Sequence, residues 1–233
     1  VNFNASGCCE PEVVHLMLRT IKPGDIVVDG GANIGFFTML MAKLVGETGR
    51  VYAFEPAEQN IHKLAVNSNA NKFENITIVS NPLWSKVEPV TLYMAENSGF
   101  TSLAKSPVTV GRAEKNAITL DVYFTKPVNI KLLKLDIEGA ELHALSRGLA
   151  SLPDYIVCEL NDEALQLFGH SANRLRYFMS EHGFGMFLLH SDGRFPTLLP
   201  FGVDIETNKS NLNVLFSTME NVVKAWPSET IGY

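Results

Sequence analysis

Apolar residues follow two patterns along the chain, short continuous runs and longer stretches with helical spacing. The short runs predict strands at 25–29, 50–55, 75–79, 131–136 and 155–160. The helical spacing predicts helices from about residue 34 to Gly46 and at 60–69, 140–149 and 172–182. Strands that alternate with helices favour an α/β fold with a doubly wound, mostly parallel sheet.

The remaining segments complete a single domain over 1–233. We expect a helical lead-in at 1–24 and an extra strand at 90–94. Segments 186–190 and 213–217 predict two strands joined by a long loop, and therefore an antiparallel C-terminal hairpin at the sheet edge. The polar stretch 95–118 is too long for an ordinary connection, so it predicts a functional loop or lid that forms part of a substrate pocket.

The first predicted strand runs into the turn DGGANIG, at the sheet edge where doubly wound folds bind ligands. Gly31 and Gly35 would let a ligand approach the backbone, and Asn33 is the non-glycine residue that best tolerates a left-handed conformation. In a GxGxxG pattern that starts at Gly30, Ala32 replaces the second glycine. The pyrophosphate fingerprint of nicotinamide and flavin enzymes is therefore incomplete.

Acidic residues end the first two predicted strands. Asp29 would meet the amino group of a zwitterionic and cationic ligand such as S-adenosylmethionine, directly or through water. Glu55 lies twenty residues after Gly35, where a carboxylate can accept both hydroxyls of a ribose. The alternatives are a turn-stabilising carboxylate for Asp29 and an ordinary exposed acid for Glu55, although Pro56 stops the strand at that point.

The third and fourth strand ends add apolar and ionic groups. After the third strand, Leu83 and Trp84 offer apolar surface for an adenine ring, although Trp84 fits a core position equally well. In the fourth strand, Lys134 and Asp136 lie on one face by the two-residue period. Lys134 would pair with Asp136, Glu138 or Glu159 and keep the carboxylates ionised, and the alternative is a purely structural ion pair.

For a ligand such as S-adenosylmethionine, transfer of its methyl group to a hydroxyl would need alignment and a proton acceptor. The hypothesis is that Asp136 or Glu138 orients or deprotonates the acceptor hydroxyl, supported by Lys134. Glu138 and Glu141 would both lie in the first turn of a helix, where the backbone dipole stabilises acids in any case. A divalent metal shared by Asp136, Glu138 and Glu159 has only weak support, so we predict no metal site.

These motifs together resemble the FkbM-type methyltransferases. The likeness covers DGGANIG at 29–35, AFEP at 53–56 with Asn60, TLD at 119–121, KLDIEGAE at 134–141 and VCE at 157–159. It implies a class I Rossmann-like fold, S-adenosylmethionine as donor, and methylation of an oxygen of a sugar, glycan or natural product. The implied cofactor residues are Asp29, Gly31, Asn33, Gly35, Glu55 and Asp136. Neighbouring candidates for cofactor contact are Gly30, Ala32, Pro56, Asn60, Leu83 and Trp84.

Composition and charge limit the classes of molecule that the protein is expected to bind. The net charge of -6 leaves no basic stripe for a phosphate backbone, so we expect no nucleic acid and a small-molecule or carbohydrate acceptor. No apolar stretch is long enough for a membrane span, and no signal-like leader is visible, which predicts a cytoplasmic protein. Cys8, Cys9 and Cys158 lack zinc-site spacing and are expected to be reduced thiols. The sequence does not predict the oligomeric state.

Two rival functions stay open at this point. A nicotinamide oxidoreductase would also use Glu55, but the incomplete GxGxxG pattern opposes it. A protein that binds the cofactor without catalysis would keep the same motifs. Methyl transfer, or its absence together with a nicotinamide-dependent absorbance change, separates these functions.

Overall fold

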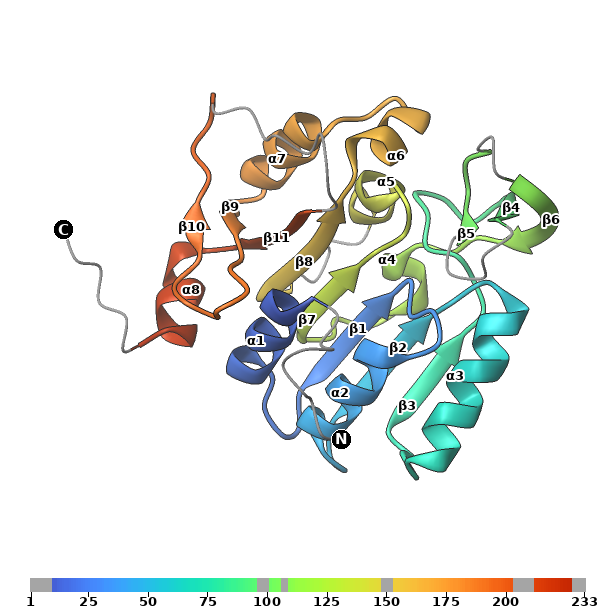
Figure 1. Cartoon of the computed structure of the whole chain (residues 1–233), viewed down its shortest axis with the longest axis horizontal. Helices are drawn as coiled ribbons and strands as arrows, with labels where there is room; N and C mark the ends of the chain where they lie inside the picture. Colours follow the sequence, from blue (N-terminus) through green and yellow to red (C-terminus); the bar gives the residue numbers. More distant parts are fainter. Residues whose placement is uncertain (1–9, 96–100, 106–108, 148–152, 203–211, 228–233) are drawn as a thin grey trace.

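The computed structural model describes residues 10–95, 101–105, 109–147, 153–202 and 212–227. Its largest element is an eight-stranded sheet with the order β10-β9-β11-β8-β7-β1-β2-β3 (Figure 1). The strands of this main sheet are β1 (Ile26–Gly30), β2 (Arg50–Phe54), β3 (Ile76–Val79), β7 (Ile130–Leu135), β8 (Tyr155–Leu160), β9 (Gly185–Leu188), β10 (Thr197–Leu198) and β11 (Leu212–Ser217). The strands predicted from apolar runs are present as β1, β2, β3, β7 and β8, which confirms that part of the prediction.

The main sheet is parallel from β3 to β8 and mixed beyond it. β1, β2, β3, β7 and β8 pair in parallel, whereas β11 is antiparallel to both of its neighbours, β8 and β9. The predicted antiparallel pairing of the last two strands is therefore confirmed. Its position differs, because β11 lies inside the sheet and the short β10 forms the edge. A strand of two residues is too short to show a period in the sequence.

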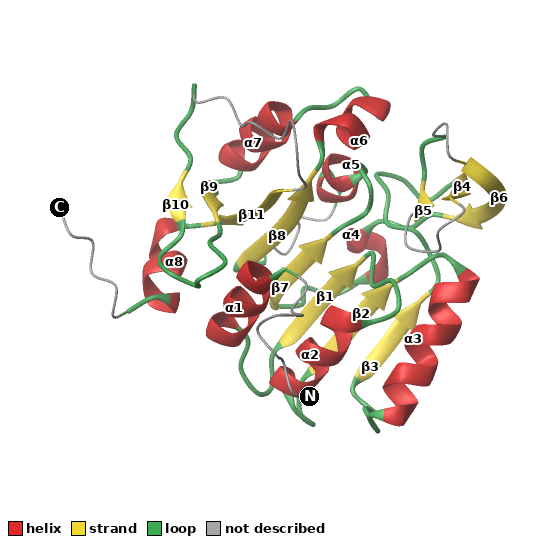
Figure 2. Ribbon diagram, in the orientation of Figure 1, coloured by secondary structure: helices red, strands yellow, loops and turns green. Residues whose placement is uncertain are grey.

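Helices cover both faces of the main sheet (Figure 2). One face is covered by α1 (Pro11–Thr20), α2 (Phe36–Val45), α3 (Glu58–Ala70) and α8 (Met219–Ala225). The other is covered by α4 (Leu120–Tyr123), α5 (Glu141–Leu145), α6 (Asp162–Leu167) and α7 (Ala172–Glu181). The predicted doubly wound arrangement is thus confirmed. The helix α1 lies in the predicted lead-in, whereas residues 1–9, with Cys8 and Cys9, lie outside the described residues; Cys158 is a buried free thiol.

Three short helices, α4, α6 and α8, were not predicted. Each begins at a side-chain N-cap, since Thr119, Asn161 and Thr218 accept a backbone N–H from the first helical turn. Such caps are a sequence signal for a helix start, but the helices that follow are too short for a clear helical period.

A separate three-stranded sheet lies beside the main one, with the order β5-β4-β6 (Figure 1). Its strands are β4 (Pro89–Ala95), β5 (Thr101–Ser102) and β6 (Thr109–Asn116), and we call it the small sheet. The strand predicted at 90–94 is β4. The segment 95–118 was predicted to be a loop, but its described part contains β5 and β6. The side chains of β6 alternate between partly covered and exposed, so neither face is apolar enough to mark a strand in the sequence.

The central strands place two ionic residues inside the molecule. In β7, Leu133 and Leu135 belong to one apolar cluster and Leu132 to the other, on opposite faces of the sheet. Lys134 shares the face of Leu132 and lies opposite Asp29 of β1 in the parallel register. From β1 the chain first builds the sheet toward β3 and later, from β7, in the opposite direction. The crevice between β1 and β7 is therefore the place where such folds bind ligands.

Candidate active site

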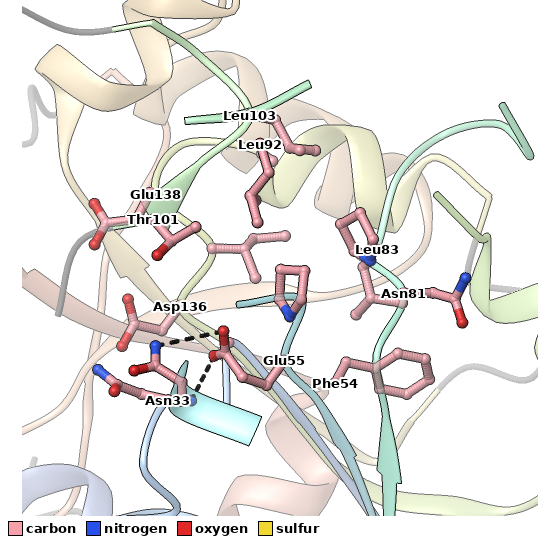
Figure 3. Close-up of a pocket in the computed structure, with 16 residues that line it drawn as sticks. Asn33, Phe54, Glu55, Asn81, Leu83, Leu92, Thr101, Leu103, Asp136 and Glu138 are labelled. Carbon is pink, nitrogen blue, oxygen red and sulfur yellow. Dashed lines mark hydrogen bonds between the residues drawn. The ribbon is translucent and has the colours of Figure 1, made fainter. Parts of the chain in front are cut away.

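A cavity opens at the carboxyl ends of the central strands (Figure 3). It encloses about 640 Å³ of empty space, including space open to solvent, and we call it the first cavity. Eight of the predicted site residues line it, namely Gly31, Asn33, Glu55, Pro56, Asn60, Leu83, Asp136 and Glu138. Leu92 and Thr101 of the small sheet also line it, together with Leu103, which follows β5. Thr101 and Leu103 belong to the segment 95–118 that was predicted to form part of a substrate pocket, whereas Leu92 was not predicted as a site residue. Residues from distant parts of the chain thus meet in one space.

Glu55 is buried and held in one orientation. Its Oε2 accepts the N–H of Asn33 at 2.8 Å, and its Oε1 accepts the N–H of Ala57 at 2.9 Å and Nδ2 of Asn60 at 3.4 Å. Burial raises the pKa of Glu55, while these hydrogen bonds act in the opposite direction. The alternative of an ordinary exposed acid is wrong, since the residue is only 4% exposed.

A buried ionic group lies next to the cavity. Nζ of Lys134 contacts Oδ2 of Asp136 at 3.1 Å, which confirms the predicted pairing, and lies 5.0 Å from the ring centre of Phe37. Burial lowers the pKa of Lys134, but Asp136 and Asp29 outweigh it and raise the pKa above its usual value. Lys134 is therefore cationic, and its charge compensates the neighbouring carboxylates in an apolar interior.

Asp29 is buried beside this pair and is only partly satisfied. Its Oδ2 accepts a hydrogen bond from Oγ1 of Thr38 at 2.6 Å, a partner that the sequence did not reveal. Burial raises its pKa, while Lys134 and Thr38 act against that. Its Oδ1 has no hydrogen-bond partner in the described part of the chain, and the same holds for Oδ1 of Asn60. Buried acceptors without a donor are uncommon in folded proteins and are consistent with a missing ligand.

The turn between β1 and α2 has the left-handed residue that the sequence predicts, and its glycines lie close to other segments of the protein. Asn33 has a φ of 51°, as expected for a left-handed residue. A Cβ on Gly31 would overlap the carbonyl oxygen of Asp136, and one on Gly35 would overlap the side chain of Leu64. Gly31 also lines the first cavity, so the expectation that a ligand approaches the backbone at these glycines stays a prediction. They allow the protein's own segments to pack closely at the cavity wall.

The turn between β7 and α5 presents Glu138 to the cavity. Glu138 has a φ of 56°, an uncommon conformation for a residue other than glycine. Oε1 of Glu141 accepts the N–H groups of Ile137 and Gly139 at 3.2 and 3.3 Å and so fixes this turn. The expectation that Glu138 lies in the first turn of the helix is wrong, because α5 begins only at Glu141.

The carboxyl group of Glu138 is poised to exchange a proton near neutral pH. Burial raises its pKa to about 7; Asp136 adds to this rise and Lys134 opposes it. Glu141 also has a pKa of about 7, chiefly through burial, but it does not line the cavity. Glu138 is therefore the better placed of the two for contact with a ligand.

Trp84 does not line the first cavity, and its side chain contacts other residues of the protein. Its ring stacks on His143 with 3.8 Å between centres, and its Nε1 donates to Oε1 of Glu88 at 3.1 Å. The predicted adenine contact of Trp84 is therefore not formed by this conformation, while the preceding Leu83 does line the cavity. Gly30, Ala32 and Gly35 also do not line it, because they pack against protein neighbours.

Among the residues with described positions, no three or more His, Cys, Asp or Glu side chains are grouped as a metal site would require. Within the same ranges, no helix is both long enough and apolar enough to cross a membrane.

The fold of the chain is similar to that of several solved methyltransferase structures. Similar solved structures include methyltransferase FkbM from Methylobacillus flagellatus, with a TM-score of 0.52 and 17% identity over 89% of this chain and 50% of that chain. A SAM-dependent O-methyltransferase from Thermotoga maritima has a TM-score of 0.51 and 14% identity, covering 90% of this chain and 64% of that one. Fibrillarin from Aeropyrum pernix, with natively bound S-adenosyl-L-methionine, has a TM-score of 0.51 and 11% identity, covering 88% and 74%. These likenesses show the fold alone, which is that of the class I methyltransferases.

The family follows from the sequence. The family model described as "Methyltransferase FkbM domain" matches residues 29–186, which is more than half of the chain. The chain therefore belongs to the FkbM methyltransferase family, and the resemblance noted in its motifs is confirmed.

Two curated relatives show how widely acceptors differ. The 31-O-demethyl-FK506 methyltransferase FkbM from Streptomyces tacrolimicus is 29% identical over 157 residues, 54% of this chain and 60% of that protein. The 23S rRNA (uracil(1939)-C(5))-methyltransferase RlmD from Acinetobacter baylyi is 28% identical over 97 residues, 42% of this chain and 20% of that protein. The matched region spans less than two thirds of either relative.

Proposed function

We propose that this methyltransferase uses S-adenosylmethionine to methylate a hydroxyl oxygen of a small, uncharged acceptor. One observation carries the proposal. The charged residues that line the first cavity, among those described, are the carboxylates of Glu55, Asp136 and Glu138. A cationic sulfonium is favoured in such a space, whereas a dinucleotide with two phosphates is disfavoured. The rival nicotinamide function is therefore less well supported.

The lining fits the parts of this cofactor. Glu55, at the end of β2, is placed to accept hydrogen bonds from the ribose hydroxyls. Leu83 and Ile137 supply apolar surface on the cavity wall for the adenine ring. Asp29 lies beside this lining and not in it, and its unpaired Oδ1 suits the ammonium group of the amino-acid part, reached directly or through water. When bound, the cofactor supplies a methyl group on a positively charged sulfur that is a good leaving group.

Glu138 and Asp136 would act on the acceptor. As the hydroxyl oxygen bonds to the methyl carbon and the carbon–sulfur bond of the bound cofactor breaks, the carboxylate of Glu138 would accept the hydroxyl proton. A pKa of about 7 lets Glu138 accept this proton at neutral pH. Asp136, paired with Lys134 at 3.1 Å, would orient the hydroxyl.

The acceptor class rests on charge and on one relative. The name of the FK506 relative denotes O-methylation of a natural product, whereas the RlmD relative modifies uracil in ribosomal RNA. The carboxylate lining and the net charge of -6 oppose a polyanionic substrate, so the proposal favours the small neutral acceptor.

The test has two measurements on the intact protein. Calorimetry is expected to show binding of S-adenosylmethionine and of its demethylated product, but not of NAD. Tritium from the labelled methyl group is expected to appear in hydroxyl compounds and not in an RNA oligonucleotide. Failure of both sulfur compounds to bind would reject the proposal, and tight binding without transfer to any acceptor would favour the non-catalytic rival.

A further inference from the structure

A second cavity lies between the small sheet and the amino-terminal end of α3. On the sheet side it is lined by Met94, Gly111, Ala113 and Lys115, and on the helix side by Glu58 and Gln59. It encloses about 1010 Å³ of empty space, including space open to solvent. Neither the motifs nor the proposed cofactor contacts account for this space.

The second cavity adjoins the first. Pro56, Asn60, Leu92 and Thr101 line both of them. The buried Oδ1 of Asn60 lacks a partner in the described part of the chain and lies at this junction. A molecule that occupies the second cavity can therefore extend one polar group into the first, toward Asp136 and Glu138.

Small side chains on one face of β6 keep the second cavity open. Ala113 pairs with Leu92 of β4, and Gly111 pairs with Met94. A Cβ at Gly111 would lie 3.1 Å from Cε of Met94, so even one added carbon would be tight there. Arg112, between them in the sequence, lies on the exposed face of the same strand. One wall of the second cavity is thus formed by every second residue of the strand β6.

The charges around the second cavity are already paired with each other. Lys115 and Glu58 are the charged residues among those described that line it, and Nζ of Lys115 contacts Oε1 of Glu58 at 3.4 Å. The rest of the lining is apolar or carries uncharged amide and hydroxyl groups. A phosphate-bearing ligand would find no unpaired cation in this lining, whereas an uncharged apolar ligand loses little on leaving water.

We propose that the second cavity binds the body of the methyl acceptor, and that the acceptor is an uncharged, mainly apolar compound whose hydroxyl reaches the first cavity. This inference rests on the proposed methyltransferase function and adds where the acceptor lies and which chemistry it has. Ala113 and Gly111 then set how wide the acceptor can be.

The experiment compares two tryptophan variants on the same strand. Binding of N-phenyl-1-naphthylamine, a neutral apolar fluorophore, is measured in the wild type, in Ala113→Trp and in Arg112→Trp. Ala113→Trp is expected to weaken binding about tenfold or more, because its indole would occupy the space that the fluorophore needs. Arg112→Trp adds the same ring on the exposed face and is expected to bind like the wild type. Both variants should bind S-adenosylmethionine with unchanged affinity.

Equal fluorophore binding in the two variants would overturn the inference. Displacement of the fluorophore by glucose 6-phosphate or by an RNA oligonucleotide would overturn the acceptor class. If Ala113→Trp loses its cooperative thermal transition, Ala113→Leu replaces it, with the same expected direction and a smaller effect. Loss of S-adenosylmethionine binding in the wild type itself would instead reject the proposed function, so the two failures are distinguishable.

Discussion

The two cavities are neighbours but are built in different ways. The first is walled by the ends of parallel strands, and two of its acidic residues are held by polar partners, Glu55 by Asn33 and Ala57 and Asp136 by Lys134. The second is formed largely by one face of the small sheet, where side-chain size and not hydrogen bonding shapes the space. The comparison indicates that the proposed cofactor site is specified by buried polar contacts, whereas the proposed acceptor site is shaped by the size of apolar side chains.

The largest effect is expected when the proposed base of the first cavity is removed. Glu138→Gln should lower kcat by about 10²- to 10⁴-fold while cofactor affinity stays near the wild-type value, because only the proton acceptor is lost. In the wild type, kcat/KM should rise with pH through a midpoint near 7, since the carboxylate must be ionised to act. Tritium-transfer rates measured across pH would check both. Glu74→Gln, at an exposed acid two residues before β3, is the control and should change neither.

The carboxyl group of Glu138 should also contribute to the free energy of unfolding. This contribution should fall as the pH rises, whereas kcat/KM should rise. The pKa of Glu138 in the folded protein is about 7, above its ordinary value of 4.5, so the folded state binds the proton more tightly. Its contribution to stability is therefore complete below about pH 4.5 and is lost as the pH rises through 7. Urea titrations should show that Glu138→Gln gains stability relative to the wild type as the pH rises from 4.5 to 8. A constant difference over that range would contradict the raised pKa.

The next largest effect is expected for the buried ion pair beside the first cavity. Lys134→Met removes the cation and leaves Asp29 and Asp136 without compensation, which should lower the free energy of unfolding by about 3–5 kcal/mol at neutral pH. Lys131 is a matched control on the same strand, because its ion pair with Asp154 at 2.7 Å is partly exposed. Lys131→Met should cost about 1 kcal/mol or less. Equal losses in urea denaturation would show that burial does not distinguish the two pairs.

A smaller effect is expected on cofactor affinity. Two acidic residues three positions apart, Glu55 and Glu58, should differ in this effect. Glu55→Gln should weaken binding of S-adenosylmethionine about 10- to 100-fold, because a charge-assisted hydrogen bond to the ribose is lost. Glu58 lines only the second cavity and is largely exposed, so Glu58→Gln should leave cofactor affinity unchanged. Calorimetry on both variants checks this. Similar losses in the two variants would place the ribose elsewhere.

Much of the main sheet and of the first cavity could be predicted because the relevant signals are local. The apolar runs of β1, β2 and β7 are continuous in the sequence, and each ends at a charged or glycine-rich motif. The pairing of Lys134 with Asp136 follows from the two-residue period of a strand. The cavity residues named from these motifs, such as Glu55 and Glu138, are therefore the ones that the structure brings together.

The features that were missed depend on contacts between distant segments. The stacking of Trp84 depends on His143, which lies 59 positions later in the sequence. The close approach at Gly31 involves the backbone of Asp136, which follows the neighbouring strand. The strand β6 has alternating side chains of nearly equal polarity, so its pairing with β4 has no apolar signature. Sequence periodicity reports burial of a face, but it does not report which segment covers that face.

The smallest effect is expected from a pair of threonines that make the same contact in the two regions. Oγ1 of Thr38 donates to Asp29 at 2.6 Å beside the first cavity, and Oγ1 of Thr91 donates to Glu114 at 2.8 Å on the exposed face of the small sheet. Thr38→Val should lower the free energy of unfolding by about 1.5–3 kcal/mol, because the buried carboxylate loses its donor while Oδ1 already lacks one. Thr91→Val should change it by about 0.5 kcal/mol or less, since water replaces the lost donor. Both changes keep the side-chain shape, so thermal or urea unfolding reports the hydrogen bond alone. If the two losses were equal, the contrast between a region fixed by polar contacts and one fixed by apolar packing would not hold.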